Sequence, residues 1–129
     1  IQGSTNFTIT GNDVLEMSVS SGSAEINISG SHSSQIASVV ELELTDNTIL
    51  TNTGTGVFSI LAEVTGSRSL THSGSGTTLL NDANTFSGGL IVNGGTVRFG
   101  NNAAAGSGTL TLNGGVIEAS GGARTLGNN

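Results

Sequence analysis

The sequence predicts an all-β fold, a parallel β-helix (solenoid) of about six coils with a period of about 20 residues. Three observations predict it. Short stretches alternate apolar and polar residues with a period of two. Turns rich in Gly, Asn and Ser separate these stretches every few residues. Leu and Gly also recur together at a fixed spacing, which an antiparallel sandwich or barrel, the alternative for short strands with frequent turns, does not predict.

The composition allows a thin core and excludes several classes of protein. Gly, Ser, Thr and Asn supply 69 of the 129 residues, whereas Leu, Ile, Val and Phe supply 34, above the roughly one-fifth below which disorder is expected. The absence of Cys excludes a disulfide framework and Cys-based zinc sites. Three Arg against nine acidic residues argue against nucleic acid and anionic membranes as partners. Frequent Gly, Ser, Thr and Asn also disfavour helices.

We expect one β-helical segment over residues 1–129, with weakly patterned coils over 1–49 and clear repeat coils over 50–129. The chain starts without Met and without a signal-peptide pattern, which predicts a processed chain or a segment of a larger protein. Thr5–Thr10 and Thr109–Leu112 are typical of ordinary strands and carry no evident cap. Because bare solenoid ends invite further strand pairing, the sequence predicts stacking at both ends.

Within each repeat, the alternation places the strands. Val40–Leu44 alternates apolar residues with Glu, Phe58–Ile60 alternates around Ser59, and Val97 and Phe99 flank Arg98. In a parallel solenoid each residue lies above its equivalent in the previous coil, so equivalent residues form columns. The 20-residue spacing predicts an inward Leu column and a Gly turn column, which consist of Leu50, Leu70, Leu90 and Leu110, and of Gly54, Gly74, Gly94 and Gly114.

A second pair of columns predicts a change of spacing. Phe58 stacks below Thr78, and Ile60 stacks below Leu80, at 20 residues. In the next coil the inward role passes to Val97 and Phe99, which is a slip of one residue, and Val97 in turn lies 20 residues before Ile117. A one-residue slip would turn a strand inside out unless a loop absorbs it. We therefore expect a turn that is one residue longer around Gly94-Gly95.

The stretch Ser69–Asn101 resembles the autotransporter-associated β-strand repeat, also called the passenger-associated transport repeat. The most specific part is A-N-T-F-S-G-G at Ala83–Gly89, and V-N-G-G-T at Val92–Thr96 supports it. The resemblance extends over about the last 70 residues. Thr78, Asn81-Asp82 and Ala105 depart from the usual pattern. The resemblance implies a right-handed parallel β-helix, exported to the surface of a Gram-negative or related bacterium and serving as a stalk within a larger passenger.

Two structural roles follow from the residues of the repeat. We expect the Asn84 side chain to bond neighbouring turn backbone or a stacked Asn of another coil, and Phe86 to fill the same corner as a buried aromatic. Arg98 and Glu118 lie 20 residues apart at outward positions. They predict a cross-coil ion pair that contributes well under about 1 kcal/mol, because exposed pairs are weak.

Candidate chemistry is sparse. Glu41 and Glu43 share one side of a strand, and Glu63 lies 20 residues after Glu43; such carboxylates serve in glycosidases or hold calcium, but a solvated outer face explains them better. His32 and His72 have no second ligand at a suitable spacing, and no Ser-His-Asp set stands out. The Gly-Gly pairs lack the helix and Lys of a phosphate-binding loop. We therefore expect no catalytic residue, metal or cofactor.

The sequence thus predicts a structural, non-enzymatic segment of a bacterial extracellular or cell-surface protein, secreted or anchored in the outer membrane. It would act as a stalk, adhesin shaft or filament subunit. Its expected partner is itself, through end-to-end stacking or the rest of a longer chain, with surface glycans as weak further partners and no small-molecule substrate. Two alternatives stay open: a carbohydrate-active β-helix enzyme, and a glycan- or receptor-binding adhesin domain whose protruding loop would be Gly30–Ser38.

Overall fold

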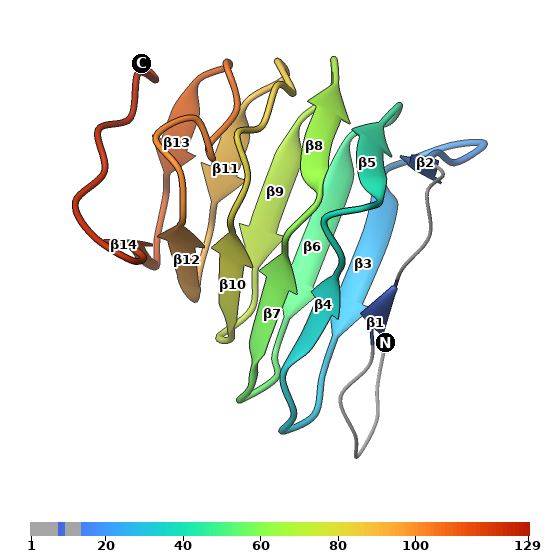
Figure 1. Cartoon of the computed structure of the whole chain (residues 1–129). Coiled ribbons are helices and arrows are strands. Elements are labelled where there is room, and N and C mark those ends of the chain that lie inside the picture. Colours follow the sequence, from blue (N-terminus) through green and yellow to red (C-terminus); the bar gives the residue numbers. More distant parts are fainter. Residues whose placement is uncertain (1–7, 10–13) are drawn as a thin grey trace.

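The chain winds into a parallel β-solenoid (Figure 1). The computed structural model describes residues 8–9 and 14–129, and these ranges contain short strands and no helix. The strands are β1 (Thr8–Ile9), β2 (Val14–Met17), β3 (Ala24–Ile28), β4 (Ser34–Ile36), β5 (Glu41–Leu44), β6 (Thr48–Asn52), β7 (Val57–Ile60), β8 (Glu63–Gly66), β9 (Leu70–Ser73), β10 (Thr77–Leu80), β11 (Leu90–Val92), β12 (Thr96–Phe99), β13 (Leu110–Leu112) and β14 (Val116–Ala119).

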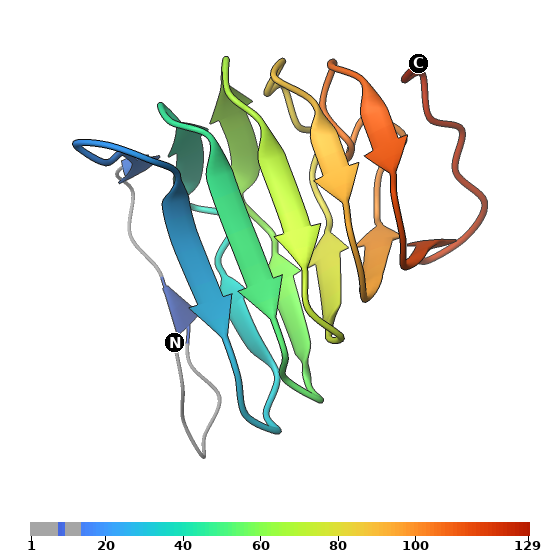
Figure 2. The ribbon, with the colours of Figure 1, turned by 180° about the vertical axis from the view of Figure 1, so that it is seen from behind.

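Three parallel sheets form the faces of the solenoid. The six-stranded sheet has the order β1-β4-β7-β10-β12-β14, the five-stranded sheet β13-β11-β9-β6-β3, and the three-stranded sheet β2-β5-β8. In Figure 1 the chain rises through the strands nearest the viewer, descends behind them and advances from right to left, and Figure 2 shows the descending strands from behind. This winding is right-handed, as crossovers between parallel strands nearly always are. The predicted fold class is confirmed.

The period of the solenoid is not constant along the chain. Ile36 pairs with Ile9 at an offset of 27 residues, and Phe58 pairs with Ser34 at 24. Later steps in the same sheet are 20 residues from Phe58 to Thr78 and 19 from Thr78 to Val97. The mean period is about 22 residues rather than 20, and the number of coils differs slightly from the six predicted. The early coils are longer because their turns hold more residues.

The predicted Leu column is confirmed for its last three residues and wrong for its first residue, Leu50. Leu70, Leu90 and Leu110 pair in register across β9, β11 and β13. Leu50 pairs instead with His72, and Thr48 lies beneath Leu70. Five residues separate Thr51 from β7, whereas three residues separate its partner Ser73 from β10. Counted from these paired residues, the path after β6 is two residues longer. An even shift keeps Leu50 on the inner face, where it is buried, but moves it to the neighbouring column.

The same shift affects the Gly turn column. A Cβ placed on Gly94 would lie 3.0 Å from the carbonyl oxygen of Gly74, so these two residues stack as predicted. Gly54, however, lies against Gly30, and Gly76 is the residue that approaches the Gly54 carbonyl oxygen. Gly114 approaches the Asn93 carbonyl oxygen. The turn column is therefore displaced at its first position, for the same reason as the Leu column.

The predicted slip of one residue occurs, but the loop that accommodates it is shorter, not longer. Thr78 pairs with Phe58 on one side and with Val97 on the other, and Val97 pairs with Ile117. Because Val92 lies above His72, two residues fill the path from Asn93 to β12, where three fill the path from Ser73 to β10. The shorter turn removes one residue and keeps the apolar side chains of β12 facing inward.

The core is a narrow channel of aliphatic side chains between the three sheets. Its largest fully buried members are Phe58, Phe86, Ile36, Leu42, Leu44, Leu50, Ile60, Leu70, Leu80 and Leu90. After β8, the three-stranded face continues without strands. The amide N–H groups of Thr85 and Ser87 still donate to the carbonyl oxygens of Val64 and Gly66, at 2.9 and 3.0 Å. Stacking thus persists where regular strand pairing ends.

The first coils follow the same plan as the later ones. Gly30–Ser38, which the sequence offered as a protruding loop, contains β4, and β4 pairs with both β1 and β7. Ile36 within it is buried. The segment is therefore a rung of the six-stranded sheet rather than a loop. Of the strand expected over Thr5–Thr10, Thr8–Ile9 is present as β1, and the other residues lie outside the described part of the chain.

Candidate functional site

The Asn84 side chain forms hydrogen bonds with the windings on both sides of its own, at one corner of the solenoid. Its side chain is buried. The Val64 N–H donates to Asn84 Oδ1 at 2.8 Å, and Asn84 Nδ2 donates to the Ala104 carbonyl oxygen at 2.7 Å. These contacts satisfy backbone groups in the winding below and in the winding above. Of the two roles expected for Asn84, the bond to neighbouring backbone is confirmed, since both of its partners are main-chain groups.

Phe86 fills the same corner, as predicted, and is fully buried. One winding below it lies Gly66, and one winding above it lies Gly106, as the backbone hydrogen bonds from Ser87 and Ser107 show. A Cβ on Gly106 would lie 2.8 Å from the Phe86 ring. A large residue thus stacks between two residues without side chains, which gives the ring its volume within a narrow core.

Arg98 and Glu118 form the predicted ion pair on the outer face of the six-stranded sheet. They pair in register, and Arg98 Nε lies 2.9 Å from Glu118 Oε2. The two side chains are 43% and 45% exposed. At this exposure the pair contributes well under about 1 kcal/mol. Its presence confirms the register of β12 and β14 rather than a functional site.

The Glu residues lie along the three-stranded sheet, but in another register than expected. Glu63 pairs with Glu41, not with Glu43, which pairs with Thr65. The Thr65 hydroxyl donates to Glu41 at 2.8 Å, and the Thr85 hydroxyl donates to Glu63 at 3.0 Å. Hydroxyl donors from the next winding thus reduce the repulsion between stacked carboxylates.

A shallow hollow of about 300 Å³ adjoins these carboxylates, and Glu41, Glu63 and Asp82 line it together with exposed Val14 and Val39. Within the described residues, no three His, Cys, Asp or Glu side chains are grouped so that they could hold a metal ion. Glu41 is exposed and Glu63 is half-buried, so these carboxylates lie on the outer face of the sheet.

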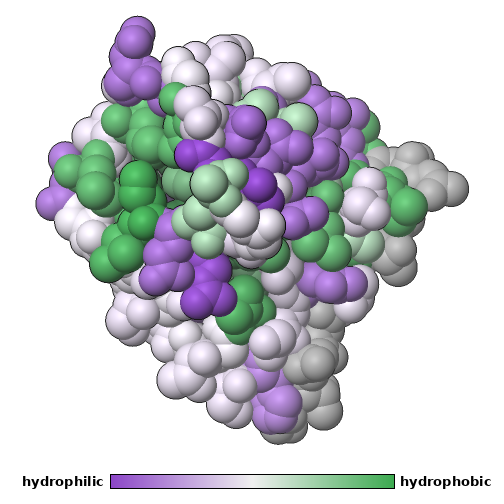
Figure 3. All heavy atoms as spheres, turned by 60° about the vertical axis from the view of Figure 1, so that its left-hand side comes forward, coloured by the Kyte–Doolittle hydropathy of each residue, from purple (hydrophilic) through white to green (hydrophobic). Residues whose placement is uncertain are grey.

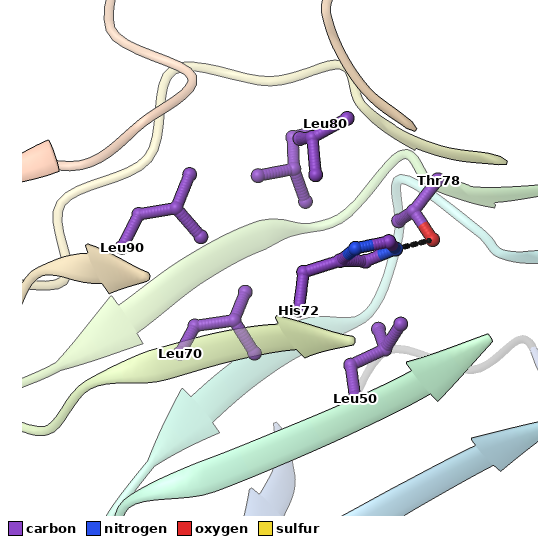
Figure 4. Close-up of a pocket in the computed structure, with 7 residues that line it drawn as sticks. Leu50, Leu70, His72, Thr78, Leu80 and Leu90 are labelled. Atoms are coloured by element: carbon purple, nitrogen blue, oxygen red, sulfur yellow. Dashed lines mark hydrogen bonds between the residues drawn. The ribbon is translucent and has the colours of Figure 1, made fainter. Parts of the chain in front are cut away.

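The two His residues occupy opposite environments. His32 is exposed in a turn, next to the Ser31 hydroxyl. His72 is buried in β9 and points into the core among Leu50, Leu70, Leu80 and Leu90 (Figure 4). The cavity beside it measures about 10 Å³, about the least that can hold one water. No substrate could enter this space.

Both ring nitrogens of His72 are within hydrogen-bond distance of a partner. Nδ1 lies 3.0 Å from the Gly94 carbonyl oxygen, and Nε2 lies 3.0 Å from the Thr78 hydroxyl. Asn52 Nδ2 donates to the same hydroxyl at 3.1 Å. The sequence showed neither contact, because Gly94 belongs to the winding above and Thr78 to another sheet of the same winding. The pKa of His72 is lowered, since burial disfavours the charged ring more than the hydrogen bond to Gly94 favours it.

The C-terminal rung exposes apolar side chains that are buried in earlier rungs. Leu112 lies in register above the buried Val92, yet it is 51% exposed, and Ile117, in register above the buried Val97, is 37% exposed. Val116 is also exposed, but it lies above Thr96 on the outer face. Among the described residues, β13 and β14 are the last strands of their sheets. Figure 3 turns this end forward and shows apolar patches interrupted by hydrophilic ones.

Arg124 is the residue at this end that sequence reasoning missed. Its Nη2 donates to the Ser120 carbonyl oxygen at 2.6 Å, while its Nε is buried with no hydrogen-bond partner. Arg124 helps to line a hollow of about 150 Å³ with Phe99, Ile117 and Leu126. Its spacing of 20 residues from the buried Ala104 was the available signal. A cation at an inward position hinders strand addition at an edge.

The last residues continue the winding beyond β14. Asn128 Nδ2 donates to the carbonyl oxygens of Gly106 and Gly108, at 3.1 and 2.7 Å. The Leu110 N–H of β13 donates to the Asn129 carbonyl oxygen at 3.0 Å. Residue 129 therefore lies where a further strand of the five-stranded sheet would begin.

Comparison with protein-family models, curated proteins and solved structures found no significant match to the chain. Within the described ranges, no helix is long and apolar enough to cross a membrane. The fold therefore defines the class of protein as a parallel β-solenoid.

Proposed function

We propose that this chain is a structural β-solenoid segment of a bacterial extracellular or cell-surface protein, which acts as a stalk, adhesin shaft or filament subunit without catalysis. The single observation that carries the proposal is the C-terminal rung, where β13 and β14 are the edge strands of their sheets and expose Leu112, Val116 and Ile117. Apolar residues along an open edge favour the addition of another strand.

The partner that fits this end is another coil of the same architecture, from the rest of a longer chain or from a second copy. A parallel coil would cover the inward residues of the last rung and pair with the backbone of β13 and β14. The incoming coil would also have to accommodate the Arg124 side chain, which helps to line the hollow at this end.

The cell-surface assignment comes from the resemblance to the autotransporter-associated β-strand repeat. The motif Ala83–Gly89 forms the corner at which Asn84 bonds two windings and Phe86 packs between Gly66 and Gly106. These roles support a repeat selected for stacking. The Ser-, Thr- and Asn-rich outer faces are suited to weak contact with surface glycans.

Analytical ultracentrifugation of the purified chain tests the proposal. We expect the mean mass to increase with concentration, and electron microscopy to show short rods. Leu112→Asp places a charge at an inward position of the last rung and should shift the chain to monomer, whereas Val39→Asp, at a similarly exposed valine on the lateral surface, should not. A wild-type chain that stays monomeric at every concentration contradicts the proposal, as does an equal effect of both variants.

A further inference from the structure

The polar cluster in the core consists of His72, Thr78 and Asn52. Only one assignment of donors and acceptors satisfies all of its hydrogen bonds. Asn52 Oδ1 accepts from the Gly54 N–H at 3.0 Å, and Asn52 Nδ2 donates to the Thr77 carbonyl oxygen at 2.9 Å. These backbone partners determine which end of the amide is which. Asn52 therefore donates to the Thr78 hydroxyl rather than accepting from it.

The protonation of His72 follows from the two ends of this chain of hydrogen bonds. A carbonyl oxygen can only accept, so His72 Nδ1 carries the hydrogen that bonds to Gly94. The Thr78 hydroxyl already accepts from Asn52, so its own hydrogen is free to bond to His72 Nε2. At neutral pH the ring is therefore the uncharged Nδ1–H tautomer, with every bond of the cluster made.

The cluster links three successive windings. Asn52 belongs to β6, His72 and Thr78 to β9 and β10 of the next winding, and Gly94 follows β11 of the winding after that. In register, His72 lies between Leu50 below and Val92 above. A polar side chain thus occupies one position of an aliphatic column and is held there by hydrogen bonds alone.

No charge in the surroundings favours an added proton. The pocket is lined by Leu50, Leu70, Thr78, Leu80, Leu90 and Val97. On β6, β9, β10, β11 and β12, the one charged side chain is Arg98, which lies on the outer face paired with Glu118. A protonated Nε2 would also need an acceptor, so Thr78 would have to turn its hydrogen away from the ring, where the apolar lining offers no acceptor.

We infer that His72, Thr78 and Asn52 form an acid-sensitive joint, which holds three windings together at neutral pH and weakens their stacking as His72 takes up a proton. This inference is independent of the proposed structural role. The lowered pKa of buried His72 has the matching sign. His72 takes up the proton at a higher pH in the unfolded chain than in the folded chain. The contribution of His72 to the free energy of unfolding is therefore fully present above about pH 6.5 and falls as the pH drops below it.

Urea unfolding at several pH values tests the joint. Below about pH 6.5, the unfolding equilibrium constant of the wild type should rise by up to about tenfold for each pH unit, until folded His72 itself titrates. The double variant His72→Leu/Thr78→Val removes the titrating ring and the hydroxyl together, and it should lose most of this dependence between pH 7.5 and 5.5. His32→Gln changes the exposed histidine and should keep it. Equal pH dependence of the double variant and the wild type would overturn the inference.

Nitrogen NMR of the imidazole rings provides a test that needs no variant. The chain has two His residues. We expect His72 as the Nδ1–H tautomer, and it should stay uncharged at about pH 6.5, where a free imidazole is half-protonated. A His72 that titrates in the folded chain at or above the pKa of a free imidazole, or that carries its hydrogen on Nε2, would refute the joint even if the double variant failed to fold.

Discussion

Outside the strands of the solenoid, Asn side chains form hydrogen bonds between neighbouring windings. Asn84 bonds Val64 below and Ala104 above, on a face where β8 is the last strand. Asn128, the penultimate residue, donates to two carbonyl oxygens of one winding, those of Gly106 and Gly108. A buried amide can donate and accept at once, so it can satisfy backbone groups of two neighbouring windings.

Asn84→Ala should therefore be strongly destabilising. The change leaves the Val64 N–H and the Ala104 carbonyl buried without partners, which costs about 3 kcal/mol of the free energy of unfolding. Urea denaturation measures it. Asn81→Ala, at an exposed asparagine nearby, is the control and should change the free energy by less than about 0.5 kcal/mol. A similar decrease in the free energy of unfolding in both variants would show that the Asn84 hydrogen bonds do not stabilise the stacked windings.

At the scale of the windings, the packing depends on size alternation between stacked segments. Phe86 fills a corner because Gly66 and Gly106 leave room beneath and above its ring. In the six-stranded sheet, one inward column instead stacks large residues directly on one another, namely Ile60, Leu80 and Phe99.

Gly106→Ala tests this packing. Its Cβ would lie 2.5 Å from the Phe86 carbonyl oxygen, and its φ of 72° lies in the left-handed region, so we expect a loss of about 3 kcal/mol or more. Gly22→Ala has a similar φ of 86° but meets nothing within 4 Å, and it should cost only about 1–2 kcal/mol. Thermal unfolding compares the two. Equal shifts in Tm would mean that strain at φ, not the contact with Phe86, accounts for the effect.

The solenoid as a whole is stabilised mainly by contacts between neighbouring windings. The strands of the six-stranded sheet pair along the chain in sequence, from β1 to β14, so each rung depends on the rungs beside it. The rung at the C-terminal end has fewer neighbours, and it is here that apolar side chains are exposed and Arg124 is incompletely paired. Stability should therefore vary along the axis.

Hydrogen exchange followed by NMR can measure this gradient with matched probes. The amides of Asn81, Gly100 and Ser120 occupy the same place in successive rungs and donate to Ile60, Leu80 and Phe99 at 3.0, 2.9 and 2.9 Å. Because their hydrogen bonds are alike, differences in protection report rung opening. We expect Ser120 to exchange about tenfold or more faster than Asn81. Equal protection in the three amides would mean that the solenoid opens only as one unit.

Much of the fold could be predicted because its signals are local. Alternation along β5, β7 and β12 identifies their inner faces, and the shared spacing of Leu70, Leu90 and Leu110 identifies the stacking. The Arg98–Glu118 pair followed from the same spacing, and the buried Phe86 followed from the motif Ala83–Gly89. The error at Leu50 arose because its column depends on the length of one loop, and a longer turn is compatible with the same alternation.

The amino-acid sequence by itself determined the strand-and-turn alternation, the inward residues and the parallel stacking of the later repeats, because each of these depends on residues a fixed distance apart. Only the tertiary structure decided the register of the early windings, the joint around His72 and the position of Arg124 at the open end. These features depend on which residues of different windings meet in the core. Which residues meet depends on the combined lengths of several loops, so no single stretch of sequence predicts these contacts.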